Sequence, residues 1–176
     1  MDRREAIKKA AIMLGGMIAL PDILRAHENP TILNLNFSLT GVQDDVLSEM
    51  ADTIIPTTDT PGAKAAGVPD FVKKMLADCY EKKDSDAVKE GLDKLEADAN
   101  AKHGKGFAKI ANEERIAMLK EVEATKSSFW RIMKDLTVTG YFTSEIGCTQ
   151  ALRYEQVPGK YIGDLPYKKG DKAWAT

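Results

Sequence analysis

Between residues 40 and 142, apolar side chains recur at every third or fourth position, and polar or charged side chains fill the places between them. This spacing matches the 3.6-residue turn of an α-helix and gathers the apolar residues on one face. The clearest run follows Thr40 and consists of Val46, Leu47, Met50, Ala51 and Ile54. No stretch gives a convincing sheet. The pattern predicts an all-α fold, a single domain of five or six helices joined by long structured loops.

Capping residues and prolines predict where these helices begin and end. Thr40 followed by Gln43 forms a capping box, and Pro56 ends the first helix near Ile55, because a residue before proline disfavours helical dihedrals. Further helices are expected at residues 71–82, opened by Pro69 or Asp70, at 84–100, at 113–124, capped by Asn112, and from Ser127 or Ser128 onward. The side chains expected on their buried faces include Cys79, Ile116, Leu119, Val122 and Tyr141.

The first 26 residues have the composition of an export signal. Arg3, Arg4 and Lys8 give a basic start, and the apolar run at 10–20 is too short to cross a bilayer of about 30 Å as a helix. The arginine pair resembles the twin-arginine signal, although Ala6 stands where that signal has an aromatic residue. An amphipathic helix packed on the domain is the alternative. The expected layout is a signal at 1–26, a linker at 27–39, a helical domain at 40–166 and a tail at 167–176.

Composition and motif content argue against several classes of function. A formal charge of −2 and a pI near 5.8 give no indication of nucleic-acid binding. The chain has two histidines and two cysteines, without metal-ligand spacing, a catalytic triad or a nucleotide-binding motif. Cys79 and Cys148 either stay unpaired or form a disulfide in an oxidising compartment, which would stabilise the fold by roughly 4 kcal/mol. We therefore predict no catalytic residue and no metal site in this chain.

The stretch at residues 136–159 differs from the helices before it. It is rich in glycine and in short hydroxyl side chains, which can bond to nearby backbone instead of extending a helix. Its aromatic residues, which can stack on a ligand or pack in a core or interface, are Tyr141, Phe142 and Tyr154. Glu145 and Arg153 can clamp a ligand, form a structural ion pair or contact a partner. We expect an irregular surface here, suited to binding more than to catalysis.

Two segments resemble a known protein family. Residues 51–72 (ADTIIPTTDTPGAKAAGVPDFV) and 136–163 (LTVTGYFTSEIGCTQALRYEQVPGKYIG) are similar to the gluconate 2-dehydrogenase subunit 3 family, the small subunits of membrane-associated, flavin-dependent sugar and sugar-acid dehydrogenases. With the opening FSLTGVQDDVLSEM, the resemblance covers most of residues 37–166 and is loose between 73 and 126. The residues of these segments that we expect to bind a partner are Pro56, Thr57, Asp59, Tyr141, Phe142, Thr143, Glu145, Arg153 and Tyr154.

The resemblance implies a non-catalytic accessory subunit. In such complexes a large subunit of the glucose–methanol–choline type holds FAD, so no cofactor is expected in this chain, and a cytochrome c subunit often passes electrons on. Family members with a twin-arginine signal can carry a large subunit that lacks its own signal through the twin-arginine machinery, already folded around FAD. A periplasmic location follows, and attachment to the membrane through the complex or through an uncleaved signal stays open.

Two other classes of function remain open from the residues alone. A free-standing periplasmic enzyme would use Glu145, Arg153 and nearby tyrosines on a small polar substrate, and the isolated chain would turn over. A disulfide-stabilised scaffold would depend on Cys79 and Cys148, and reduction would unfold it or release a partner. An accessory subunit predicts a stable complex and no turnover by the chain alone.

Overall fold

A computed structural model describes residues 37–157, 159–160, 163–164 and 166–175. Its elements are α2 (Gly41–Ile54), α3 (Val68–Asp78), α4 (Lys82–His103), the 3-10 turn η2 (Phe107–Lys109), α5 (Asn112–Ala124), α6 (Ser128–Phe142) and the π-helical turn η3 (Gly147–Ala151). Within the described residues there are five α-helices and no strand, which confirms the all-α prediction. The expected signal at 1–26 and most of the linker at 27–39 lie outside these residues.

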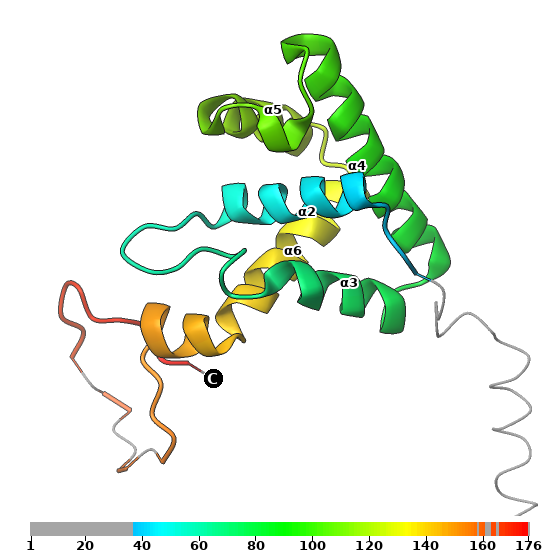
Figure 1. Cartoon of the computed structure of the whole chain (residues 1–176). Coiled ribbons are helices and arrows are strands. Elements are labelled where there is room, and N and C mark those ends of the chain that lie inside the picture. The colour runs from blue at the N-terminus through cyan, green and yellow to red at the C-terminus, as the bar shows by residue number, and fades with distance from the viewer. Residues whose placement is uncertain (1–36, 158, 161–162, 165, 176) are drawn as a thin grey trace, which may run out of the picture.

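Helix α2 lies at the centre of the helical domain (Figure 1). It contacts α3, α4, α5 and α6, and its inner face, made of Val46, Leu47, Met50 and Ala51, is buried as predicted. Helix α6 packs against both α3 and α4 and adds Met133 and Leu136 to the same core. The helices therefore share one continuous apolar core. None of them, in the part of the chain that the structure describes, is both long and apolar enough to cross a membrane.

The predicted capping box at the start of α2 is confirmed. The Gln43 N–H donates to Thr40 Oγ1 at 3.3 Å, and the Thr40 N–H donates to Gln43 Oε1 at 3.0 Å. The Gln43 amide nitrogen also donates to Asp93 Oδ1 at 2.8 Å, so the same residue attaches the start of α2 to α4. Ser127 caps α6 by accepting a hydrogen bond from the Trp130 N–H at 3.3 Å.

Helices α3 and α4 have different boundaries from those predicted. Helix α3 begins at Val68, after Gly67 with a φ of 73°, and it ends at Asp78 instead of residue 82. Helix α4 runs from Lys82 to His103, beyond the predicted 84–100, and Gly104 ends it with a φ of 66°. Both glycines adopt the left-handed conformation that favours this residue, and at Gly104 it forms a helix C-cap.

The predicted cap and apolar stripe of α5 are both wrong in part. Asn112 is the first helical residue, and Ala111 occupies the N-cap, where its N–H donates to Glu114 Oε2 at 3.1 Å. The buried side chains are Met118 and Leu119, whereas Ile116 is exposed. Helix α5 packs mainly on α2, and packing against other helices, which the local pattern does not show, decides which of its apolar side chains are buried.

Cys79 is also placed differently from the prediction. It was expected on the buried face of its helix, but α3 ends one residue earlier, and Cys79 is exposed at the C-cap. The buried face of α3 is instead formed by Val68, Val72 and Leu76, with Phe71 and Met75 half-buried beside them.

Candidate partner-binding surface

The structure brings the two family-like segments together on one side of the domain. The loop after α2 meets the end of α6 at Tyr141, whose hydroxyl donates to the Pro61 carbonyl at 2.9 Å. The Thr60 hydroxyl oxygen lies 3.1 Å from the Tyr141 hydroxyl oxygen. Tyr141 is only 2% exposed, so this contact is shielded from water. The buried Tyr141 thus connects the loop after α2 to the end of α6, although the bonded residues lie 80 positions apart in the sequence.

The first loop, residues 55–67, is held closed by its own hydrogen bonds. The Ala63 N–H donates to the Ile55 carbonyl at 2.9 Å, and the Gly62 N–H donates to Thr57 Oγ1 at 2.9 Å. A Cβ at Gly62 would lie 2.7 Å from the Thr57 backbone nitrogen, so the tight crossing favours glycine there. These contacts present Pro56, Thr57 and Asp59 at the surface of an ordered loop.

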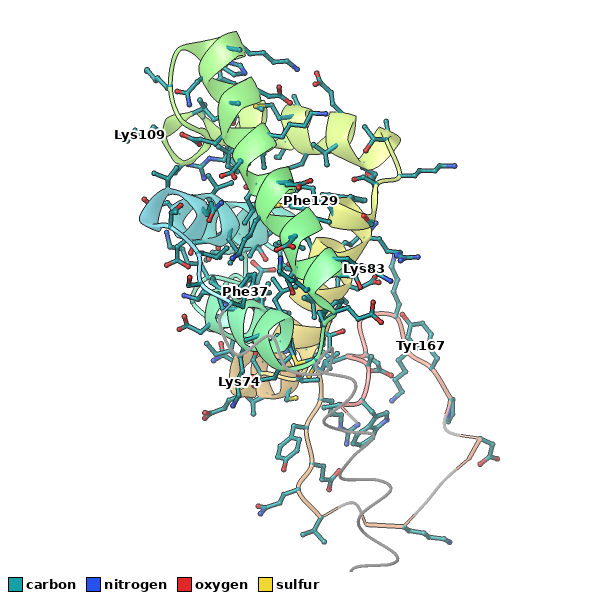
Figure 2. The ribbon with its side chains drawn as sticks, turned by 90° about the vertical axis from the view of Figure 1, so that its right-hand side faces the viewer. Phe37, Lys74, Lys83, Lys109, Phe129 and Tyr167 are labelled. Atoms are coloured by element: carbon teal, nitrogen blue, oxygen red, sulfur yellow. The ribbon has the colours of Figure 1, made fainter. Side chains whose placement is uncertain are left out.

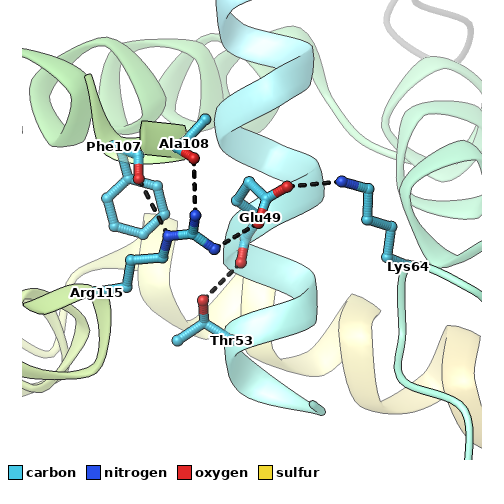
Figure 3. A network of polar contacts seen from close by, with 6 residues as sticks. All are labelled: Glu49, Thr53, Lys64, Phe107, Ala108 and Arg115. Atoms are coloured by element: carbon cyan, nitrogen blue, oxygen red, sulfur yellow. Dashed lines mark hydrogen bonds and ion pairs between the residues drawn. The ribbon is translucent and has the colours of Figure 1, made fainter. Parts of the chain in front are cut away.

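A charged network joins this loop to the helical core (Figure 3). Glu49, on α2, accepts a hydrogen bond from Lys64 of the loop at 2.6 Å and forms an ion pair with Arg115 of α5. Arg115 also donates from Nε to the Phe107 carbonyl at 3.2 Å and from Nη2 to the Ala108 carbonyl at 2.7 Å. One guanidinium therefore ties η2 and α5 to the helix that carries the loop.

Ionised Glu49 is favoured in this network. Burial is the largest single influence and raises its pKa, but the hydrogen bond from Lys64 and the positive charges of Arg115 and Lys64 together outweigh it. The pKa of Glu49 is therefore below its ordinary value. The same pairing raises the pKa of Lys64.

The second segment changes from regular helix to an irregular turn after Phe142. The Ser144 hydroxyl donates to the Tyr141 carbonyl at 2.6 Å and accepts from the Gly147 N–H at 3.0 Å. These bonds lead into the π-helical turn η3, a conformation that is frequent at functional sites. The predicted irregular surface is thus present, but it begins at residue 143, because α6 continues through residues 136–142.

The C-terminal tail folds back onto this second segment. The Arg153 N–H donates to the Ala173 carbonyl at 2.8 Å, and the Ala175 N–H donates to the Arg153 carbonyl at 2.9 Å. The Arg153 guanidinium lies over the Trp174 ring, 3.9 Å from its centre. Lys172 donates to the Gln150 carbonyl. Residues 172–175 are therefore attached to the helical domain, although the sequence suggested a separate tail.

Two open hollows lie along the line where these segments meet. The first has a volume of about 580 Å³ and is lined by Thr58, Asp59, Thr60, Gln150, Ala151 and Lys172. The second has a volume of about 400 Å³ and is lined by residues that include Thr149, Arg153, Tyr154, Lys172 and Trp174. Lys172 lines both hollows, so the first loop, η3 and the tail form one continuous surface.

Of the residues expected to bind a partner, Asp59, Arg153 and Tyr154 line these hollows. The others, apart from Tyr141, are exposed: Pro56, Thr57, Phe142, Thr143 and Glu145. Tyr141 differs from them because it is buried and holds the first loop in place. Arg153 stacks on Trp174 and does not form the ion pair with Glu145 that was considered from the sequence. No pattern in the sequence pointed to Trp174, which lies in the tail beyond both family-like segments.

Cys79 and Cys148 do not pair, and both are free thiols. Cys79 is exposed at the C-cap of α3, and the Cys148 thiol donates to the Phe142 carbonyl at 3.1 Å. Because the two thiols are free, the disulfide-stabilised scaffold loses its support.

Exposed apolar side chains are frequent in the C-terminal part of the domain. Of the eight large apolar side chains exposed among the described residues, six belong to residues 138–174: Val138, Phe142, Tyr154, Val157, Tyr167 and Trp174. In the same described part of the chain, no three acidic, histidine or cysteine side chains gather as a metal site would require. Exposed aromatic side chains beside open hollows are typical of a macromolecular interface.

Tyr141→Phe is expected to loosen the first loop. The change keeps the buried ring and removes the hydroxyl that the Pro61 carbonyl needs, which costs about 1–2 kcal/mol of unfolding free energy. Denaturant unfolding measures the loss, and hydrogen exchange should show faster exchange at the Gly62 and Ala63 amides. Tyr167→Phe is the matched control, since Tyr167 is 79% exposed and its change should leave stability unaltered. Equal stability of both variants would remove Tyr141 as the fastening residue.

Comparison with known proteins gives one match. The model of a family described as Gluconate 2-dehydrogenase subunit 3 matches residues 42–159, more than half of the 176 residues of the chain. The match contains the first loop, Tyr141 and η3, and it ends before the tail that carries Trp174. Neither a curated protein nor a solved structure matches the chain.

Proposed function

Because this chain belongs to the gluconate 2-dehydrogenase subunit 3 family, we propose that it is the non-catalytic accessory subunit of an FAD-dependent sugar or sugar-acid dehydrogenase. The family description itself makes the chain a component of a multi-subunit dehydrogenase. The proposal adds that the catalytic large subunit is a flavoprotein of the glucose–methanol–choline type, and that this chain binds it without holding a cofactor.

The convergence of the two family-like segments is the observation that supports this role most directly. Tyr141 joins the first loop to the end of α6, and the charged network of Glu49 holds the same loop from the other side. The domain thus orders two loops against each other around open hollows. Such pre-ordering lowers the entropic cost of binding a partner.

Export of the large subunit is the second part of the proposal. Arg3, Arg4 and Lys8 resemble the start of a twin-arginine signal, and this route carries folded proteins. A flavoprotein that receives FAD before export needs such a route, so the chain would bring the folded large subunit to the periplasm. A cytochrome c subunit would then accept the electrons.

Co-expression of the tagged chain with a candidate large subunit, an FAD-containing dehydrogenase from the same organism, tests the proposal. We expect the large subunit to co-purify with FAD, seen as flavin absorbance, and to appear in the periplasmic fraction only when this chain is present. The isolated chain should be colourless and show no turnover. A chain that stays alone under gentle conditions contradicts the proposal, and sugar-acid oxidation by the chain alone would favour the free-standing enzyme.

A further inference from the structure

We infer that the C-terminal loop, defined as the described residues 153–157, 159–160, 163–164 and 166–175, contacts an acidic patch with exposed apolar groups on the large subunit. This inference rests on the proposed function and deepens it, because it names the contact element and the chemistry of the partner surface. The family match ends at residue 159, so most of this loop lies outside it. The argument uses only the described residues of the loop.

The C-terminal loop is closed at its base by contacts within the chain. Both backbone groups of Arg153 are bonded to the tail, and its guanidinium stacks on Trp174. Near the tip, the Lys168 N–H donates to Asp171 Oδ2 at 2.9 Å, and the Asp171 N–H donates to the Lys168 carbonyl at 2.9 Å. Closure at the base and an ordered turn mean that less conformational entropy is lost when a partner binds.

The exposed residues of the C-terminal loop are of the types that dominate binding energy at interfaces. Tyr154 is 56% exposed, Tyr167 is 79% exposed and Trp174 is 47% exposed, and Arg153 lies against Trp174. Tryptophan, tyrosine and arginine are the residues enriched among interface hot spots. Figure 2 shows Tyr167 standing away from the helical body, at the end of the molecule opposite Lys109.

Charge selects the kind of partner. Residues 153–175 carry five basic and three acidic side chains, a net charge of +2, whereas residues 37–152 carry 15 basic and 20 acidic side chains, a net charge of −5. The loop is therefore a basic element on an acidic body, and it should be attracted to a negative surface. An anionic lipid surface fits less well, because lipid-binding segments cluster 4–8 basic residues and this loop intersperses three acidic ones.

Variants of the C-terminal loop test the inference in the full chain, with the FAD-containing large subunit, dissociated from the wild-type complex, as the probe. Trp174→Ala should raise the Kd by about 30-fold, about 2 kcal/mol, while Trp174→Phe keeps most of the affinity. Lys168→Glu with Lys169→Glu should slow association by about tenfold at low salt, and the difference should shrink at high salt. Lys105→Glu with Lys109→Glu is the matched control, since both lysines are exposed and Figure 2 shows Lys109 at the end of the molecule opposite Tyr167.

The outcomes distinguish failure of the inference from failure of the proposed function. If the wild-type chain forms the complex and all loop variants bind as tightly, the contact lies elsewhere and the inference is wrong, while the proposed function stands. If the wild-type chain forms no complex, both fall. If the loop variants lose binding only to vesicles of phosphatidylcholine and phosphatidylserine, the loop is a lipid-binding element and the inference is overturned. Circular dichroism should match the wild type in every variant, because the changed side chains are exposed.

Discussion

Gly147→Ala is expected to lower the free energy of unfolding by about 3 kcal/mol. A Cβ at this position would lie 1.8 Å from the Tyr141 carbonyl oxygen and 2.7 Å from its carbonyl carbon. Both atoms belong to the backbone of α6, so no side-chain rotation can relieve the overlap. Helix propensity alone predicts that Gly147→Ala raises the free energy of unfolding, because alanine is favoured over glycine by about 1 kcal/mol within a helix. The sign of the measured change therefore reports whether the close approach exists.

Gly41→Ala is the matched control for this prediction. Gly41 lies in the first turn of α2, and a Cβ there would have no neighbour within 4 Å. We expect denaturant unfolding to show no loss for Gly41→Ala and a clear loss for Gly147→Ala. The Gly147 variant should also lose affinity for the large subunit, because η3 positions the chain that enters the C-terminal loop. A Gly147 variant as stable as the control would contradict the packing of η3 against α6.

Arg115→Met should lower the free energy of unfolding by about 2–3 kcal/mol. The change keeps most of the apolar stem but leaves the Phe107 and Ala108 carbonyls without their donors and Glu49 with Lys64 as its only cation. The side chains of Arg115 and Glu49 are only 16% and 19% exposed, so water replaces these bonds poorly. Lys102→Met is the control, because Lys102 pairs with Glu121 in the open and should cost under about 1 kcal/mol.

The pH dependence of stability provides a second readout of the same network. The pKa of Glu49 is lowered in the folded state, so its ionised form contributes stability at pH values above the ordinary glutamate pKa of about 4.3. This contribution is lost as the pH falls through the lower, folded value. We therefore expect Glu49→Gln to be less stable than the wild type near neutral pH and the two unfolding curves to converge below about pH 4. A gap that stays constant across this range would show that Glu49 titrates as it does in the unfolded chain.

The helices were predictable because their signals are local. The capping box of Thr40 and Gln43, the apolar face of α2 and the Ser127 cap of α6 each depend on residues within a few positions of one another. The predictions were wrong where packing between helices decides which side chains of a helix are buried. Ile116 belongs to a helical apolar pattern, but α5, which packs against α2, buries Met118 and Leu119 and leaves Ile116 exposed.

The surface was predictable only in its parts. The resemblance singled out both segments and placed Tyr141 among the partner contacts, whereas the helical pattern predicted Tyr141 to be buried, and the structure confirms its burial. It also could not point to Trp174, because the family match ends at residue 159. An aromatic residue in a short Gly- and Lys-rich tail carries no periodic pattern that predicts what it packs against.

The helical class, the capping box of α2 and the family follow from the sequence, since periodicity, capping and motif strings are properties of neighbouring residues. The tertiary structure adds that Tyr141 reaches Pro61, that Arg115 holds Glu49 across 66 residues, and that Arg153 stacks on Trp174. These contacts join segments far apart in the chain, and their geometry follows from how the helices pack around α2. The candidate surface exists because that packing brings separate loops to one side of the domain.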